Sequence, residues 1–210
     1  MPKPNSNAPP FPSDIAFTDA VKAVQTRKGS RGAYARMETS GGWETEVTDA
    51  LAEFIHEQTS FFLASANGEG QPYVQHRGGP KGFLRVVDAH TLGFADFSGN
   101  RQYITLGNLA ENPKVQLFLV DYATRQRIKI WGEAKVVEDD AELLASLKPE
   151  GYVARAERAI IIDVKTWDAN CPQHIPLKID AADVEHLIAE KDRRIAELEK
   201  EVARLKNAPK

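Results

Sequence analysis

The chain has 210 residues, of which 42% are hydrophobic and 27% charged, and its net charge is −3. This length fits one domain with some additional elements, and the apolar fraction is sufficient for a packed core. The mixed, mildly acidic charge argues against a surface for nucleic acid or for an anionic membrane.

Features that the sequence lacks indicate where the protein resides and whether it binds a metal. No apolar run approaches the roughly 20 residues that a membrane span needs, and the first residues lack the apolar segment of a secretory signal. Cys171 is the single cysteine, so no intrachain disulfide can form, and no second cysteine could join it in a zinc site. We therefore expect a cytoplasmic protein that binds neither nucleic acid nor membrane and holds no metal.

The first third of the chain is predicted to be mostly irregular or helical. Residues 1–13 are rich in Pro and Asn and are expected to be disordered or draped. Helices are predicted for 14–27, ended by Gly29, and for 49–58. Between them, the basic stretch 28–37 is expected to be irregular.

From Ser60 onward the pattern changes to short apolar runs separated by turn residues. The predicted strands are 60–66, 72–76, 83–87, 92–97, 115–120, 127–137 and 159–164. Helices are predicted at 101–110 and 139–147, and a loop at 168–177. Many short strands with few helical crossovers favour an α+β fold with a closed or nearly closed antiparallel barrel, here assigned to 14–180.

Residues 181–210 form a separate charged segment in which 182–206 is predicted to be helical. Ile188, Ile195 and Val202 recur every seven residues, and a second such series, Val184, Leu198 and Leu205, is interrupted by Lys191. This spacing is typical of either a dimeric parallel coiled coil or an amphipathic helix packed on its own domain. The sequence leaves both open.

One segment that could bind an anion is Phe94–Tyr103, where a strand is followed by a turn and a predicted helix that opens with Arg101. Helix-start N–H groups and a guanidinium match phosphate oxygens, and Ser98 and Asn100 could supply further donors. Taken alone, the segment fits an ordinary capped helix with a solvated arginine as well.

Two further segments could line a binding site. His76-Arg77-Gly78-Gly79-Pro80 is basic and would let the backbone approach something flat, or would simply form a loop. Trp167–Pro176 places Asn170, Cys171, Gln173 and His174 in a segment held by two prolines, which suits either a structural loop or recognition of a ring edge by polar groups.

Taken together, the segment from about residue 44 to 137 and the loop near Trp167 resemble the pyridoxamine 5′-phosphate oxidase-like, FMN-binding split-barrel family. The strongest marks are Phe94-Ala-Asp-Phe-Ser-Gly-Asn-Arg-Gln-Tyr, Leu109-Ala-Glu-Asn-Pro and Arg125-Gln-Arg-Ile-Lys-Ile-Trp-Gly. Asn170-Cys-Pro-Gln-His-Ile resembles a mark of one branch of that family. The resemblance implies a split barrel with flanking helices, FMN as cofactor, and a homodimer with the flavin site at the subunit interface.

The resemblance also assigns site residues. The family's phosphate-binding Ser-Arg-Lys turn matches Asn100, Arg101 and Gln102, so one positive charge is missing here. Either Gln126 or Arg127 could face the flavin, because they lie on opposite faces of one predicted strand. The residues implied to bind the cofactor are Gln75, His76, Arg77, Gly78, Asp96, Ser98, Asn100, Arg101, Gln102, Gln126, Arg127, Trp167, Asn170, Cys171, Gln173 and His174.

The oxidase itself ends in an Arg-Leu-x-x-Arg-type segment that this chain lacks. We therefore expect an FMN-dependent oxidoreductase that acts on another small molecule, with His174 and His76 as candidate acid–base residues. The alternatives are a protein that binds or carries flavin, haem or deazaflavin without turnover, and a structural protein that interacts through its C-terminal helix.

Overall fold

The computed structural model describes residues 11–170 and 172–206. The chain divides into two compact units, the first made of Met1–Val120 and Arg127–Cys171 and the second of Asp121–Gln126 and Pro172–Lys210. Within the described ranges, no helix combines the length and the apolar character that crossing a membrane requires.

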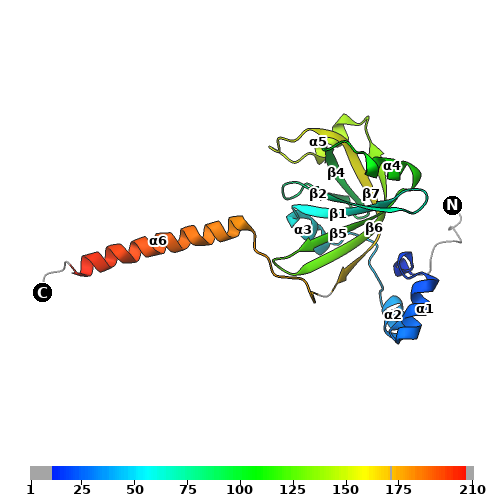
Figure 1. Cartoon of the computed structure of the whole chain (residues 1–210), viewed down its shortest axis with the longest axis horizontal. Coiled ribbons are helices and arrows are strands. Elements are labelled where there is room, and N and C mark those ends of the chain that lie inside the picture. Colours follow the sequence, from blue (N-terminus) through cyan, green and yellow to red (C-terminus); the bar gives the residue numbers. More distant parts are fainter. Residues whose placement is uncertain (1–10, 171, 207–210) are drawn as a thin grey trace. The chain divides into compact units, whose positions relative to one another are not determined.

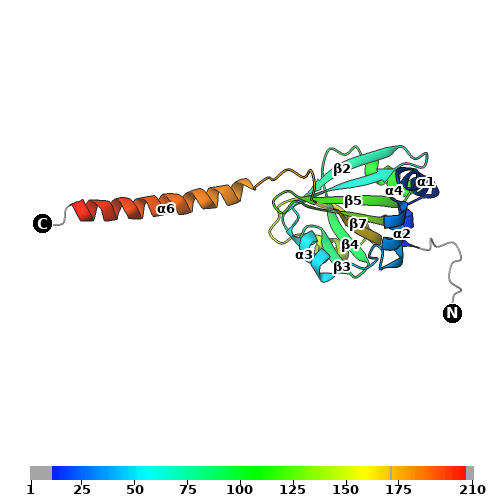
Figure 2. The ribbon, with the colours of Figure 1, turned by 90° about the horizontal axis from the view of Figure 1, so that it is seen from below.

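The first unit is built on one antiparallel sheet of seven strands (Figure 1). The strands are β1 (Ser60–Ala66), β2 (Pro72–Gly78), β3 (Arg85–Asp88), β4 (Thr91–Phe97), β5 (Lys114–Asp121), β6 (Gln126–Val137) and β7 (Ala156–Asn170). Their order across the sheet is β2-β1-β5-β6-β7-β4-β3. Figure 2 shows β2 and β3 at opposite margins of this sheet.

The sheet curls on itself, because strands far apart in its order share one core. Phe61 of β1 and Phe94 of β4 meet edge to face with ring centroids 5.4 Å apart, although three strands separate β1 from β4. The alternation of buried and outward residues along β1, β5 and β6 supplies the inner face. This is the expected α+β split barrel, and the prediction of the fold class is confirmed.

The helices of the first unit are α1 (Asp19–Lys28), α2 (Arg31–Thr39), α3 (Asp49–Glu57), α4 (Ile104–Glu111) and α5 (Ala141–Leu147), preceded by a 3₁₀ turn, η1 (Pro12–Ile15). The second unit contains α6 (Ala181–Lys206). Thr48 caps α3 by accepting a hydrogen bond from the backbone N–H of Leu51. Leu51 and Ile55 on its inner face are at most 2% exposed, so α3 covers part of the core.

Several local predictions were wrong. The basic stretch 28–37 is not irregular, since α2 begins at Arg31, directly after Gly29 ends α1 in the left-handed conformation. Arg31 donates a hydrogen bond to Gln25 of α1, which joins the two helices, and another to the buried Glu38 of α2 itself. Arg85 rather than Phe83 begins β3, because Phe83 and Leu84 lie in the core ahead of the strand.

The predicted loop at 168–177 begins later than expected, because β7 runs on to Asn170. Its extension pairs with the start of β6, where Ile130 lies opposite Trp167. A register shift next to Gly132 accommodates this long pairing, and a Cβ at Gly132 would lie only 2.6 Å from the carbonyl oxygen of Asp163. Trp167 therefore belongs to a strand.

Candidate functional site

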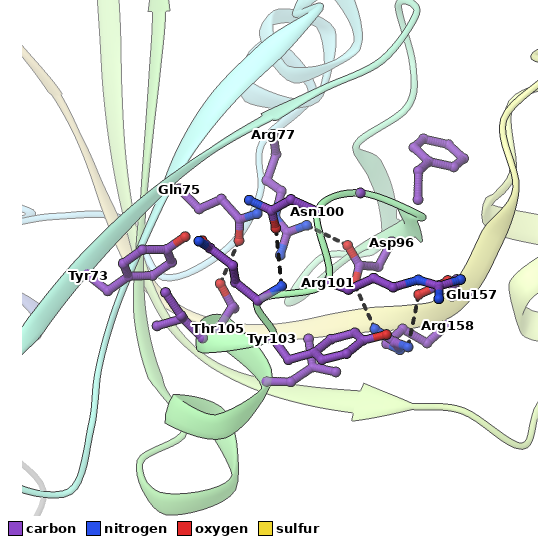
Figure 3. A pocket seen from close by; sticks show the side chains of 15 residues that line it. Tyr73, Gln75, Arg77, Asp96, Asn100, Arg101, Tyr103, Thr105, Glu157 and Arg158 are labelled. Atoms are coloured by element: carbon purple, nitrogen blue, oxygen red, sulfur yellow. Dashed lines mark hydrogen bonds and ion pairs between the residues drawn. The ribbon is translucent and has the colours of Figure 1, made fainter.

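A pocket of about 250 Å³ opens in the first unit where β2, the end of β4 and the start of α4 meet (Figure 3). Tyr73, Gln75 and Arg77 line it from alternate positions of β2, as one face of a strand requires. Thr105 in the first turn of α4 donates a hydrogen bond of 2.7 Å to the side-chain oxygen of Gln75. This bond ties the helix to the strand across the pocket.

Asp96 of β4 is the buried charge at the side of the pocket. It is 5% exposed and pairs with Arg77 of β2 at 2.5 Å and with Arg158 of β7 at 3.4 Å. Figure 3 shows the two guanidinium groups on either side of this carboxylate. Arg158 also contacts Glu157 at 3.1 Å and Glu138 at 3.0 Å. A carboxylate between two arginines is compensated, and both arginines are held in place at the pocket wall.

The turn between β4 and α4 forms the rim. Arg101 was predicted to open the helix, and this is wrong: α4 begins at Ile104. Arg101 and Tyr103 have φ angles of 59° and 55°, so the chain twice enters the left-handed region before the helix starts. Asn100 accepts a hydrogen bond from the backbone N–H of Gln102, which fixes the turn. Non-glycine residues in this conformation are uncommon and often mark functional sites.

The first turn of α4 lines the pocket and has no side-chain cap within the part of the chain that the structure describes. Its N-cap residue, Tyr103, makes no side-chain cap hydrogen bond, and Ile104, Thr105 and Leu106 of the first turn all line the pocket. The unpaired N–H groups of a first helical turn attract anions. Arg101 lines the same pocket, together with the amide side chains of Asn100 and Gln102.

The residues of the pocket fit a phosphate group. Three arginines line it. Arg77 and Arg158 are compensated by Asp96, Glu157 and Glu138, so the uncompensated cation of the pocket among the described residues is Arg101. Arg77 lines this pocket, and its Nε is buried without a hydrogen-bond partner among the described residues. A free helix N-terminus, amide side chains and guanidinium groups form the donor set that phosphate oxygens require.

Several of the predicted site residues meet in this pocket. They are Gln75, Arg77, Asp96, Asn100, Arg101 and Gln102. Sequence reasoning missed Tyr73, Tyr103, Thr105, Glu157 and Arg158, which line it as well. The alternation of β2 could have identified Tyr73 as the neighbour of Gln75. Nothing in the sequence indicates Arg158, which reaches Asp96 from a strand 62 positions further along the chain.

Other predicted residues lie elsewhere in the first unit. His76 is exposed on the opposite face of β2, where its ring meets Phe62 at 5.7 Å. Gly78 is at the end of that strand, and the backbone N–H of Ser98 donates to the carbonyl of Arg155. Trp167 packs on the core and its indole N–H donates to the carbonyl of Glu46. None of these four lines the pocket.

The remaining predicted residues lie at the start of β6, at or after the end of β7, and in the second unit. Gln126 is exposed at the start of β6, and Arg127 beside it is half-buried. Asn170 ends β7, and Cys171 lies outside the described residues. Gln173 and His174 are exposed in the second unit, and His174 has a φ of 65°. The pocket is lined by residues of the first unit alone.

The sequence suggested that Gly78 and Gly79 would let the backbone approach something flat. In the structure, the flat group against Gly79 is the ring of Phe83 of the same chain. A Cβ at Gly79 would lie 2.7 Å from Cβ and Cγ of Phe83. Phe83 is buried and stacks on Phe61 with ring centroids 5.6 Å apart. Gly79 is therefore required for core packing.

The chain is similar to several solved structures. One of them is HupZ from Group A Streptococcus, which is 19% identical with a TM-score of 0.49, over 63% of this chain and 98% of that one. A putative pyridoxamine 5′-phosphate oxidase from Lactobacillus delbrueckii is 22% identical with a TM-score of 0.45, over 60% and 95% of the two chains. An FMN-binding protein from Syntrophomonas wolfei is 11% identical with a TM-score of 0.46, over 70% and 97%.

No curated protein sequence matches the chain. The family model described as pyridoxamine 5′-phosphate oxidase matches residues 47–171, which is more than half of the chain and includes all seven strands. By this match, the chain belongs to the pyridoxamine 5′-phosphate oxidase family.

Proposed function

We propose that the chain binds FMN with its phosphate at the N-terminus of α4 and uses it to oxidise or reduce a small molecule. The observation that carries this proposal is that the uncapped first turn of α4 lines one pocket with Arg101 and with Arg77, whose buried Nε is unsatisfied among the described residues. Together they offer oriented N–H donors and positive charge to a single phosphate.

Different residues of the pocket would bind different parts of FMN. Arg101, Asn100 and Gln102 would hold the phosphate with the N–H groups of α4, while Gln75 and Arg77 would lie along the ring system. Asp96 would act through Arg77 and Arg158 by fixing both guanidinium groups. When bound, FMN would supply the transfer of electrons or hydride, and the protein would supply orientation and electrostatics.

A second copy of the chain would complete the site. The pocket volume of about 250 Å³ is below the roughly 300–1,000 Å³ typical of small-molecule sites, so one copy supplies only part of a flavin site. The outward face of β1 and β2 exposes Phe62 by 37% and Val74 by 59%, and such apolar exposure suits a subunit interface. We propose a homodimer through this face, with polar residues of 167–174, His174 among them, reaching the partner's flavin.

The absorption spectrum of the purified protein and a flavin titration test the proposal. We expect a flavin spectrum, or saturable uptake of FMN in preference to FAD and riboflavin. Reduction of the bound flavin by NADH or NADPH, followed by reoxidation in air, would support turnover. A haem Soret band with no flavin uptake would instead favour a haem-binding protein, and uptake without reduction by either nucleotide would favour a carrier.

A further inference from the structure

Helix α6 carries an exposed apolar stripe along its whole length. Its 26 residues span about 39 Å at 1.5 Å per residue. Six apolar side chains of the two seven-residue series are 40% to 63% exposed: Val184, Ile188, Ile195, Leu198, Val202 and Leu205. The helix lies outside the residues that match the family, so this surface is a feature of the chain in its own right.

We propose that this stripe binds the same stripe of a second copy, as a parallel, in-register, two-stranded coiled coil. The first argument is the type of residue at each position. Ile188, Ile195 and Val202 occupy position a of the heptad, and Leu198 and Leu205 occupy position d. β-Branched residues at a with leucine at d favour parallel dimers over higher oligomers.

The second argument is charge complementarity along the flanks. In a parallel pair, each g residue faces the e residue of the following heptad on the other helix. Arg194 at g then faces Glu199 of the second copy, and Glu201 at g faces Lys206 of the second copy. Both contacts are attractive, each occurs twice by symmetry, and no g–e contact in this alignment joins like charges.

The antiparallel alternative is less favourable. There e faces e and g faces g when the two stripes overlap fully, and Asp192 then faces Glu199 of the second copy twice. Those two like-charge contacts offset part of the attraction of Arg194 to Glu201 and of Glu185 to Lys206, whereas the parallel pair has two kinds of attractive flank contact and no repulsive one. The flank charges therefore select the parallel orientation.

Lys191 at position d is accommodated by the same geometry. In a parallel pair, the hole that receives a d side chain includes an e residue of the other helix, and that residue is Asp192. Each Lys191 ammonium thus lies beside a carboxylate of the second copy. A polar residue at a single a position is known to specify register at a cost in stability, and we infer the same effect for Lys191 at d.

Disulfide trapping in the full-length protein tests the proposal. In a Cys171→Ser background, single cysteines are introduced at Ile188 and Leu205 in the stripe, and at Lys200 on the outer face as the matched control. Cysteines bridge when their Cα atoms are about 4.4–6.8 Å apart, and like positions of a parallel pair meet this condition. We expect both stripe variants to form covalent dimers in a glutathione redox buffer and the Lys200 variant not to.

Each other outcome overturns the proposal. Cross-linking only in a mixture of the Ile188→Cys and Leu205→Cys proteins would show an antiparallel pair. Equal cross-linking of the stripe and control variants would show mere proximity, and no cross-linking in any variant would show that the stripe does not bind the same stripe of a second copy. The flavin spectrum is independent of these results.

A charge reversal tests the flank contacts separately. With Leu205→Cys as reporter, Arg194→Glu turns two attractive contacts into repulsive ones and should lower the dimer equilibrium by about tenfold. Adding Glu199→Arg should restore it. If the double variant remained as weak as the single one, the proposed pairing of Arg194 with Glu199 would be wrong.

Discussion

Arg77 of β2 and Asp96 of β4 form an ion pair of 2.5 Å, although four strands lie between β2 and β4 in the order of the sheet. Their side chains are only 12% and 6% exposed. The contact therefore joins the two ends of the curled sheet and at the same time forms one wall of the pocket. The barrel fold and the proposed cofactor site depend on the same charged contact.

Asp96→Asn should destabilise the fold strongly. The change leaves Arg77 and Arg158 without their shared carboxylate. Removing one partner of a buried ion pair costs about 3–5 kcal/mol. The free energy of unfolding, measured by urea denaturation, should fall by about that amount.

Glu57→Gln is the matched control for this loss. The hydrogen bond from Lys81 lowers the pKa of Glu57, but the pair is exposed, and exposed pairs contribute about 0–1 kcal/mol. Equal losses for the two variants would mean that the contact of Asp96 has no special weight in the fold.

The sheet could be predicted from the sequence because its strands alternate clearly. Ser60–Ala66 was predicted with the bounds that the structure has, since its alternate residues fill the core. The site could be predicted only in part. Residues 101–103 were predicted to be helical and are not, because Arg101 and Tyr103 have positive φ angles. Neither residue type indicates such an angle.

Long-range contacts set the other limit. Arg158 enters the pocket only because the first half of β7 pairs with β4, with Asp96 opposite Arg158. Strand pairing between such distant segments cannot be derived from local pattern. In the same way, the basic composition of 28–37 gave no indication of α2. Arg31 of this helix bonds to Gln25 of the preceding helix, and such a contact between two elements is not part of a local pattern.

Arg101→Gly should be more stable than Arg101→Ala. Both lose the guanidinium, but only glycine adopts a φ of 59° without steric cost, and the left-handed conformation costs other residues about 1–2 kcal/mol. Thermal unfolding of the two variants without flavin should show the glycine variant melting higher. The reverse order would argue that Arg101 does not hold this conformation in solution.

Val74→Arg should weaken the proposed barrel dimer. Val74 is 59% exposed on the outward face of β2, so the substitution should not disturb the core of one copy, but it would bury a charge at a subunit interface. Light scattering should show monomers in a variant that also lacks 181–210.

Removal of 181–210 alone should leave a dimer that still binds flavin, and a monomer after that truncation would assign dimerisation to α6.

Arg101→Ala tests the phosphate site most directly. A guanidinium that pairs with a phosphate contributes charge-assisted hydrogen bonds of about 1.5–3 kcal/mol, so the affinity for FMN should fall by roughly ten- to a hundredfold. Riboflavin has no phosphate, and its affinity should barely change. Gln102→Lys should tighten FMN, because it adds positive charge beside the first turn of α4. Fluorescence titration of both flavins separates the phosphate from the ring: an equal loss of FMN and riboflavin binding would show that Arg101 supports the fold and that the phosphate lies elsewhere.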